Sequence, residues 1–171
     1  KGIHLLVEKP IAATTAEAEE LVALAQKKGV ILQVGHVERF NPVMNFLEAI
    51  AKKPRFIEAH RLAPYPPPRE GMLPRGTEVS VVLDLMIHDL EVILHLVGSP
   101  VREIRAVGVP VLSRSEDIAN VRLQFENGCV ANVTASRISP ERMRKIRVFL
   151  EDTYVSLDYQ NQSGELYRKA Q

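Results

Sequence analysis

The sequence has little of what marks a secreted, membrane-spanning or nucleic-acid-binding protein. It contains one cysteine, so it cannot form an internal disulfide, and a reducing compartment is expected. No apolar run approaches the roughly 20 residues that cross a bilayer, and no signal peptide is recognisable. The net charge of +1 excludes the strongly basic surface that nucleic acids attract. We therefore expect a cytoplasmic protein with no nucleic-acid or membrane partner.

A phosphate-binding glycine turn is also missing. No Gly-x-Gly-x-x-Gly pattern occurs anywhere in the chain, so a nucleotide site could be only half present. The chain also begins abruptly, because Lys1-Gly2 leads without a methionine into an apolar run at residues 3–7. That run reads as a strand buried on both faces, which a natural domain seldom places first. We expect the chain to be the C-terminal part of a longer polypeptide.

What is present begins with a strand, a helix and a strand. Apolar runs at residues 3–7 and 30–35 flank a helix that Thr14 or Thr15 can cap and that Gly29 ends. A strand, helix and strand within some thirty residues form a βαβ unit with parallel strands. One such unit cannot cover its own sheet, which again indicates missing sequence.

The rest of the chain has the pattern of an α+β domain. The periodicity predicts helices at 42–51 and 79–97, a strand at 56–62 and, between them, a long loop rich in proline and glycine. From residue 101 the apolar residues alternate, and Asn127-Gly128 predicts a hairpin, with Cys129 as a small core residue. A further strand pair is expected at 145–150 and 153–159. These elements predict a mostly antiparallel open sheet with helices on one face.

Glu8-Lys9-Pro10 is the first candidate for chemistry. It lies where a parallel strand ends, and open α/β sheets bind ligands at that edge. The ammonium of Lys9 could stabilise a developing alkoxide, or it could be a surface charge at the start of a loop. Glu8 could bind a sugar hydroxyl or neutralise Lys9. Pro10 stiffens the loop, and its peptide bond can be cis.

Asp84 and His88 are the second candidate. They are four residues apart on the expected helix and therefore share a face, which continues through Glu91 and His95. The stripe could simply be the wet side of an amphipathic helix. Alternatively, Asp84 orients His88 and makes it a general base. A metal site is a third reading, but the outer pair of the stripe is about 16 Å apart at 1.5 Å rise per residue, and no third ligand is obvious.

Other polar residues are candidates for a pocket. His36 and Arg39 follow the second strand and could line a binding site, or they could belong to a packed domain junction. Arg61, Arg69 and Arg75 lie in or beside the proline-rich loop. They could grip phosphate, although each could equally be a solvated charge.

Three stretches resemble the glucose–fructose oxidoreductase/inositol dehydrogenase family (Gfo/Idh/MocA). They are LVEKP at 6–10, VGHVERFNP at 34–42 and LDLMIHD at 83–89, and their order and spacing match as well. The resemblance implies an NAD- or NADP-dependent oxidoreductase. Residues 1–36 would be the C-terminal remnant of a dinucleotide-binding Rossmann domain, and residues 37–171 an α+β domain for substrate binding and oligomerisation. A homo-oligomer through the open sheet would follow.

The resemblance also implies roles for single residues. Lys9 would touch cofactor and substrate, and Asp84 and His88 would be the catalytic pair, with His88 as base. Arg39 would lie near cofactor or substrate, and Glu8, Pro10 and His36 would help to bind the cofactor. Glu91 departs from the family, which often has aspartate there, and receives no role.

The motifs are most similar to a branch of the family that oxidises the 3-hydroxyl of UDP-N-acetylglucosamine-type sugars. The substrate would then be a sugar or nucleotide sugar, with Arg61, Arg69 and Arg75 suited to its diphosphate. Two other classes stay open on the residues alone. One is a non-catalytic binding or assembly module, and the other is a metal-dependent hydrolase that uses the Asp84 and His88 stripe.

Overall fold

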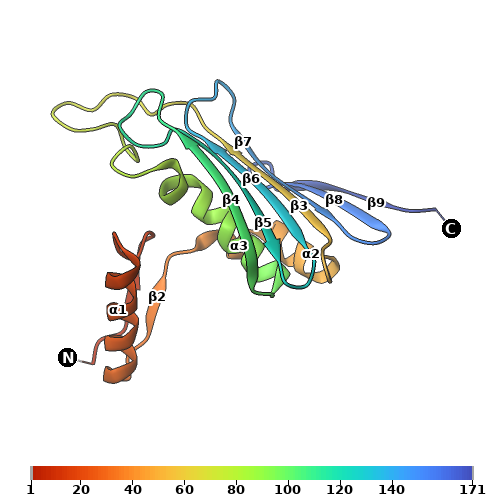
Figure 1. Cartoon of the computed structure of the whole chain (residues 1–171), viewed down its shortest axis with the longest axis horizontal. Coiled ribbons are helices and arrows are strands. Elements are labelled where there is room, and N and C mark those ends of the chain that lie inside the picture. Colours follow the sequence, from red (N-terminus) through yellow and green to blue (C-terminus); the bar gives the residue numbers. More distant parts are fainter. Residues whose placement is uncertain (1, 171) are drawn as a thin grey trace. The chain divides into compact units, whose positions relative to one another are not determined.

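The computed structural model describes residues 2–170 and divides the chain into two compact units, residues 1–37 and 38–171 (Figure 1). The first unit holds β1 (Leu5–Val7), α1 (Thr15–Lys28) and β2 (Leu32–Val34). Its strands are parallel, with Leu5 opposite Leu32, which confirms the predicted βαβ unit. Thr14 caps α1 through a capping box with Glu17, and Gly29 ends the helix with a φ of 62°.

The prediction that the first strand is buried is wrong for the described residues. Leu5 is 50% exposed and Leu6 is 77% exposed. The physical reason is that this sheet has only two strands and one helix, so most of its apolar surface has no covering layer. Of the residues of α1, only Ala25 is buried.

The second unit is built on a seven-stranded sheet. In chain order its elements are η1 (Val37–Phe40, whose first residue belongs to the first unit), α2 (Pro42–Ile50), β3 (Phe56–Leu62), η2 (Val82–Met86), α3 (Ile87–Val97), β4 (Val101–Val109), β5 (Ile118–Phe125), β6 (Val130–Ser136), β7 (Met143–Phe149), β8 (Thr153–Asp158) and β9 (Ser163–Arg168). The strand order is β4-β5-β6-β3-β7-β8-β9. Only β3 and β6 pair in parallel, so the predicted α+β architecture with a mostly antiparallel sheet is confirmed.

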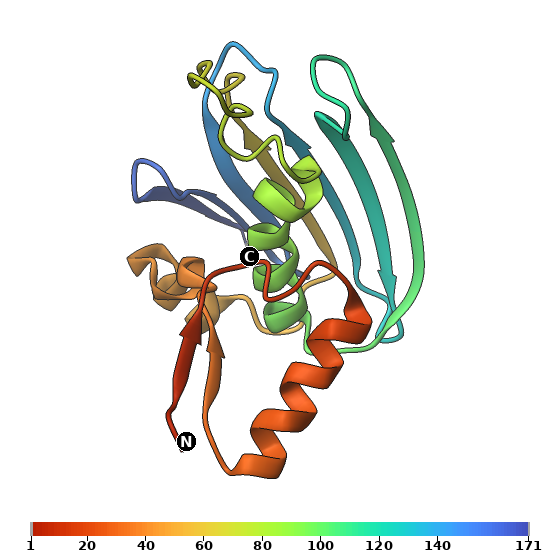
Figure 2. The ribbon, with the colours of Figure 1, turned by 90° about the vertical axis from the view of Figure 1, so that its left-hand side faces the viewer.

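The core lies between this sheet and the helices α2 and α3, which cover one of its faces (Figures 1 and 2). Alternate residues of the central strands point into it, as the period-two pattern requires. Full burial of a side chain such as valine, leucine, isoleucine or methionine contributes roughly 1.5–3 kcal/mol to the free energy of unfolding. Fully buried members include Met44, Leu47, Ile57, Val92, Ile93, Val133, Ile146 and Val148. Within residues 2–170, no helix is both long and apolar enough to cross a bilayer.

Several local predictions hold. The Asn127-Gly128 turn joins β5 to β6 as an antiparallel hairpin, with Gly128 at a φ of 87°. Cys129 beside it is buried, and burial raises the pKa of its thiol to about 11. The strand pair predicted at 145–150 and 153–159 corresponds to β7 and β8. The last strand, β9, was not predicted.

The helix predicted at 79–97 begins three residues later and in a different form. Residues Val82–Met86 form a turn of π-helix, and only from Ile87 is the helix regular. Backbone groups just before it are already bound elsewhere. The carbonyl of Val79 accepts from Arg137 and Ser115, and the amide of Val81 donates to Glu116. The carbonyl of Val79 is therefore taken by side chains, whereas the carbonyl of Ser80 accepts from the amide of Asp84 at 3.0 Å.

A buried ion pair joins α3 to β3. Arg61 donates two hydrogen bonds to Asp89, at 2.7 and 3.1 Å, and one to Glu38 at 3.1 Å. Arg61 is 3% exposed and Asp89 is 1% exposed. Burial opposes the charge on Arg61, but the two carboxylates outweigh it and raise the pKa of the guanidinium above its ordinary value.

Replacement of Asp89 by leucine should lower the free energy of unfolding by about 3–5 kcal/mol, because it leaves the buried Arg61 charge without its main partner. Glu48→Ala is the matched control. Glu48, on α2, pairs with His95, which lies on α3 like Asp89. Both side chains are well exposed, so loss of this pair should lower the free energy of unfolding by under about 1 kcal/mol. Urea denaturation followed by circular dichroism measures both. Equal effects would show that the buried pair does not hold the helix.

Candidate active site

In the first unit, the predicted residues gather at the carboxyl ends of β1 and β2. The amide of Gly35 donates to the carbonyl of Val7 at 2.8 Å, so the segments that follow the two strands start side by side. Glu8 lies against Gly35, where an added Cβ would meet its carboxylate at 3.4 Å. Lys9 follows, half-buried, and its peptide bond to Pro10 is cis.

His36 contributes a buried polar atom at the same edge. Its Nδ1 has no hydrogen-bond partner among residues 2–170. An ammonium, a carboxylate and an imidazole nitrogen thus stand at the edge of a parallel sheet where such folds bind nucleotides. This donor set fits the ribose end of a dinucleotide. The pyrophosphate end would need the glycine turn that the sequence lacks.

In the second unit, Asp84 and His88 lie on either side of the junction between η2 and α3. Both are half-buried, and they lie four residues apart along the chain. Single turns of π-helix occur often at functional sites. The structure therefore keeps the two candidate catalytic residues one turn apart, in a stretch of irregular helix.

The carboxylate of Asp84 rests on the backbone of Gly76. A Cβ at position 76 would lie 2.9 Å from the carboxyl carbon of Asp84 and would overlap its Oδ2. Gly76 also has a φ of 85°, which side chains other than glycine rarely adopt. The sequence showed Gly76 only as one of many glycines and prolines in the loop.

The other members of the polar stripe are engaged separately. Glu91 pairs with Arg39, and His95 contacts Glu48 at 2.9 Å. Over the described part of the chain, no three His, Cys, Asp or Glu side chains gather as a metal site requires. Arg39, expected near cofactor or substrate, is partly exposed and held by this ion pair.

The three arginines expected to bind phosphate differ in their surroundings. Arg61 is buried, and its guanidinium pairs with Asp89 and Glu38. Arg69 holds its own loop, donating to the carbonyl of Leu73 and pairing with Glu78. Arg75 is exposed and is the one whose guanidinium is most available.

Sequence reasoning missed the buried polar residues around α3. The hydroxyl of Tyr159 is buried and has no hydrogen-bond partner within residues 2–170. Burial, reinforced by the nearby charges of Asp89 and Glu38, raises the pKa of Tyr159 well above its ordinary value. No local pattern marks these residues, because they come from distant parts of the chain.

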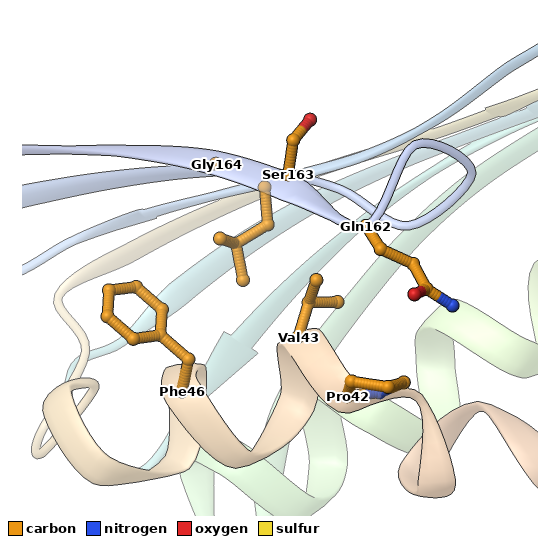
Figure 3. Close-up of a pocket in the computed structure, with 7 residues that line it drawn as sticks. Pro42, Val43, Phe46, Gln162, Ser163 and Gly164 are labelled. Carbon is orange, nitrogen blue, oxygen red and sulfur yellow. The ribbon is translucent and has the colours of Figure 1, made fainter.

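A shallow pocket lies between α2 and the start of β9 (Figure 3). Phe46 and Val43 point from the helix towards the hairpin that carries Gln162. The pocket contains no candidate catalytic residue. It is lined by Pro42, Val43, Phe46, Leu157, Gln162, Ser163 and Gly164.

Two family models match the chain. One, described as the GFO/IDH/MocA C-terminal domain, matches residues 53–156. The other, described as an oxidoreductase family with an NAD-binding Rossmann fold, matches residues 1–36. Together they cover most of both units.

Curated relatives are longer than this chain. UDP-N-acetylglucosamine 3-dehydrogenase of Acidithiobacillus ferrooxidans is 38% identical over 169 residues, which is 98% of this chain and 52% of the relative. Myo-inositol 2-dehydrogenase of Thermotoga maritima is 27% identical, over 96% of this chain and 55% of the relative. The chain thus spans about half the length of these relatives.

Solved structures agree with the fold. That of the Acidithiobacillus ferrooxidans enzyme superposes with a TM-score of 0.88, covering 98% of this chain and 54% of that one. The WlbA dehydrogenase of Chromobacterium violaceum, in complex with NADH and UDP-GlcNAcA, is 19% identical and has a TM-score of 0.80, over 92% of this chain and 49% of that one. At that identity the likeness concerns the fold alone. On the match of its C-terminal domain and of its first 36 residues, the chain belongs to the GFO/IDH/MocA family of NAD-binding oxidoreductases.

Proposed function

We propose that this chain is the C-terminal part of an NAD- or NADP-dependent dehydrogenase that oxidises a secondary alcohol of a sugar. Residues 1–36 complete a dinucleotide-binding domain whose phosphate-binding turn lies upstream, and residues 37–171 bind the substrate. The half-length match to sugar dehydrogenases and the family models for both segments support this division.

One observation carries the assignment of chemistry. Asp84 precedes His88 by one helical turn, and its carboxylate is seated on a glycine backbone instead of projecting freely into solvent. A carboxylate held one helical turn from an imidazole can orient a general base and stabilise the imidazolium that forms.

In the proposed reaction, His88 accepts the proton of the substrate hydroxyl. The C–H electron pair leaves the same carbon as a hydride, so the alcohol carbon becomes a carbonyl. Lys9 stabilises the alkoxide that develops as the proton departs, and Asp84 stabilises the charged imidazole. The nicotinamide ring supplies the hydride acceptor. Glu8, Pro10 and His36 stand at the sheet edge suited to its ribose.

Replacing His88 by alanine should lower kcat by about two to four decades, the usual contribution of a general base. Binding of NAD or NADP should be unchanged. The measurement is steady-state kinetics, with calorimetry for the cofactor, in the longer protein that carries the upstream nucleotide-binding segment. His95→Ala is the matched control, because His95 lies on the same helix but pairs with the exposed Glu48. Full activity of His88→Ala would refute the assignment.

The finer proposal is that the sugar carries a nucleoside diphosphate. The support is the relative that acts on UDP-N-acetylglucosamine, together with two arginines, Arg69 and Arg75, in one loop. An arginine fork matches phosphate oxygens in a bidentate manner. For Arg69 to take part, its guanidinium must leave the exposed ion pair with Glu78.

Arg75→Ala should raise KM for a nucleotide sugar about tenfold, the effect of losing about 1.4 kcal/mol of binding, and should leave KM for the free sugar unchanged. Arg69→Ala should act in the same direction but less strongly, because part of its role is to hold the loop. The exposed Arg102 on β4 provides the control substitution, Arg102→Ala. Equal effects on both substrates would count against a diphosphate.

We also propose that the open face of the sheet joins copies of the chain. The helices cover the other face, and on the open face four aromatic rings from neighbouring strands form a ladder. Phe149 stacks on Tyr154 at 4.8 Å between ring centroids, and Tyr154 stacks on Tyr167 at 5.6 Å. Phe56 meets Phe149 edge-on at 5.8 Å, and Tyr167 is 54% exposed. Aromatic residues are enriched at protein interfaces.

Substituting both Tyr154 and Tyr167 by alanine should weaken self-association by about tenfold or more, since aromatic anchors carry most interface energy. Sedimentation velocity over a concentration series measures the change. Phe46→Ala, which removes an exposed ring from α2 on the helical side, should have no effect. An unchanged oligomeric state of the double variant would rule out this face.

A further inference from the structure

The guanidinium of Arg137 is buried and uses every one of its N–H groups. Arg137 lies just after β6, is 2% exposed, and donates through Nε to Asp117 at 2.8 Å. One terminal nitrogen donates to the carbonyls of Gly76 and Val79, at 2.6 and 2.8 Å. The other donates to the hydroxyls of Ser113 and Ser115, both at 2.9 Å. A guanidinium has five donors in a fixed planar fork, and all five are accounted for here.

Asp117 links the guanidinium of Arg137 to the loop at residues 111–113. It is fully buried, and its Oδ2 accepts from the backbone amides of Val111, Leu112 and Ser113, at 2.6 to 2.9 Å. Burial disfavours the ionised form, but these hydrogen bonds and the guanidinium of Arg137 outweigh it and hold the pKa of the Asp117 carboxyl far below its usual range. The pair therefore stays charged at neutral pH.

Two of the five bonds from Arg137 go to the segment 76–79, which leads into η2. The glycine at its start is the residue on whose backbone the Asp84 carboxylate rests. Its carbonyl is held by Arg137, its φ of 85° fixes the turn, and Asp84 packs against its α carbon. A short chain of contacts thus runs from Asp117 through Arg137 and Gly76 to Asp84.

We propose that Arg137, together with Asp117, is a positioning residue for Asp84: it fixes the turn at Gly76 against which the Asp84 carboxylate packs, one helical turn before His88. Arg137 itself does not reach the reacting atoms. The expected effect on turnover rests on the proposed function, whereas the positioning of the Asp84 carboxylate by Arg137 does not. A misplacement of about 1 Å in a catalytic group can cost on the order of 10²-fold in rate.

The last contact in the chain can be tested with two glycines of the same loop. Gly76→Ala should lower kcat about 10- to 100-fold, because the new methyl group displaces the Asp84 carboxylate. Gly71→Ala is the matched control, since Gly71 also has a positive φ, of 67°, but no atom lies within 4 Å of its added Cβ. Its backbone strain is similar and its kcat should stay within about twofold. Equal losses in the two variants would overturn the contact as a positioning element.

The clamp itself is tested with Arg137→Lys and Asp117→Asn. Lysine keeps the charge but has three donors and no planar fork, so it cannot hold both loop segments. We expect kcat to fall about tenfold or more, with KM for cofactor and for sugar nearly unchanged. Leu47→Ala controls for lost stability, because Leu47 lies in the core under α2. If the clamp variants lose no more kcat than Leu47→Ala, Arg137 only stabilises the fold.

A measurement on the 171-residue chain separates this inference from the proposed function. The carboxyl carbon of Asp84, labelled with ¹³C, can be observed by NMR without any substrate. Its chemical shift at one fixed pH should change in Gly76→Ala and in Arg137→Lys, since the surroundings of the carboxylate change, and should stay in place in Gly71→Ala. An unchanged Asp84 signal in both variants overturns the inference, even if the enzyme is active. If the signal changes but the longer protein oxidises no sugar, the positioning role stands and the proposed function is refuted.

Discussion

The constraint on which the candidate site depends is the close approach of a carboxylate to a glycine backbone. Asp84 is useful to His88 only if its carboxylate is held in one place, and the side chain packs against Gly76 so closely that no Cβ fits between them. The buried guanidinium of Arg137 holds the loop at Gly76 through the carbonyl of that residue. The carbonyl of Val79 and the amide of Val81, just before η2, are likewise bound outside the helix.

Buried charge is used twice in the second unit, in two different ways. Arg61 and Asp89 tie α3 to β3 through two parallel hydrogen bonds. Arg137 and Asp117 tie loops to one another and shape the approach to that helix. Removing one partner from either pair would leave an uncompensated buried charge, the costly case for an ion pair. Dense hydrogen bonding offsets the free-energy cost of desolvating both pairs. Its main effect is to fix the positions of the bonded groups rather than to raise the free energy of unfolding.

Much of the fold follows from local sequence signals. The capped helix after Thr14, the Asn127-Gly128 hairpin and the strand at Phe56–Leu62 were all predicted, because capping, turn chemistry and alternation act over a few residues. The π-helical turn at Val82–Met86 was not predicted, because hydrophobic periodicity does not distinguish one such turn from regular helix. The exposure of Leu5 and Leu6 was not predicted either, because periodicity reports which side chains prefer burial and not what covers them.

The site could be predicted only in part. Motif order brought out Lys9, Asp84 and His88, and their shared role stays a proposal. Arg61 was expected to bind phosphate, yet it pairs with a residue 28 positions away, which no local pattern reveals. The same holds for Arg137, whose partners Gly76 and Asp117 lie 61 and 20 residues from it. The cytoplasmic location also stays a prediction.

The central proposal is that His88 takes the proton from a hydroxyl group of a bound sugar. A crystal structure of the longer protein with NADH and a nucleotide sugar tests it most directly. The account predicts that the hydroxyl oxygen on the carbon facing the nicotinamide lies within hydrogen-bonding reach, about 2.6–3.2 Å, of the His88 imidazole. A substrate bound beside the nicotinamide with the His88 imidazole out of reach of that oxygen would contradict it.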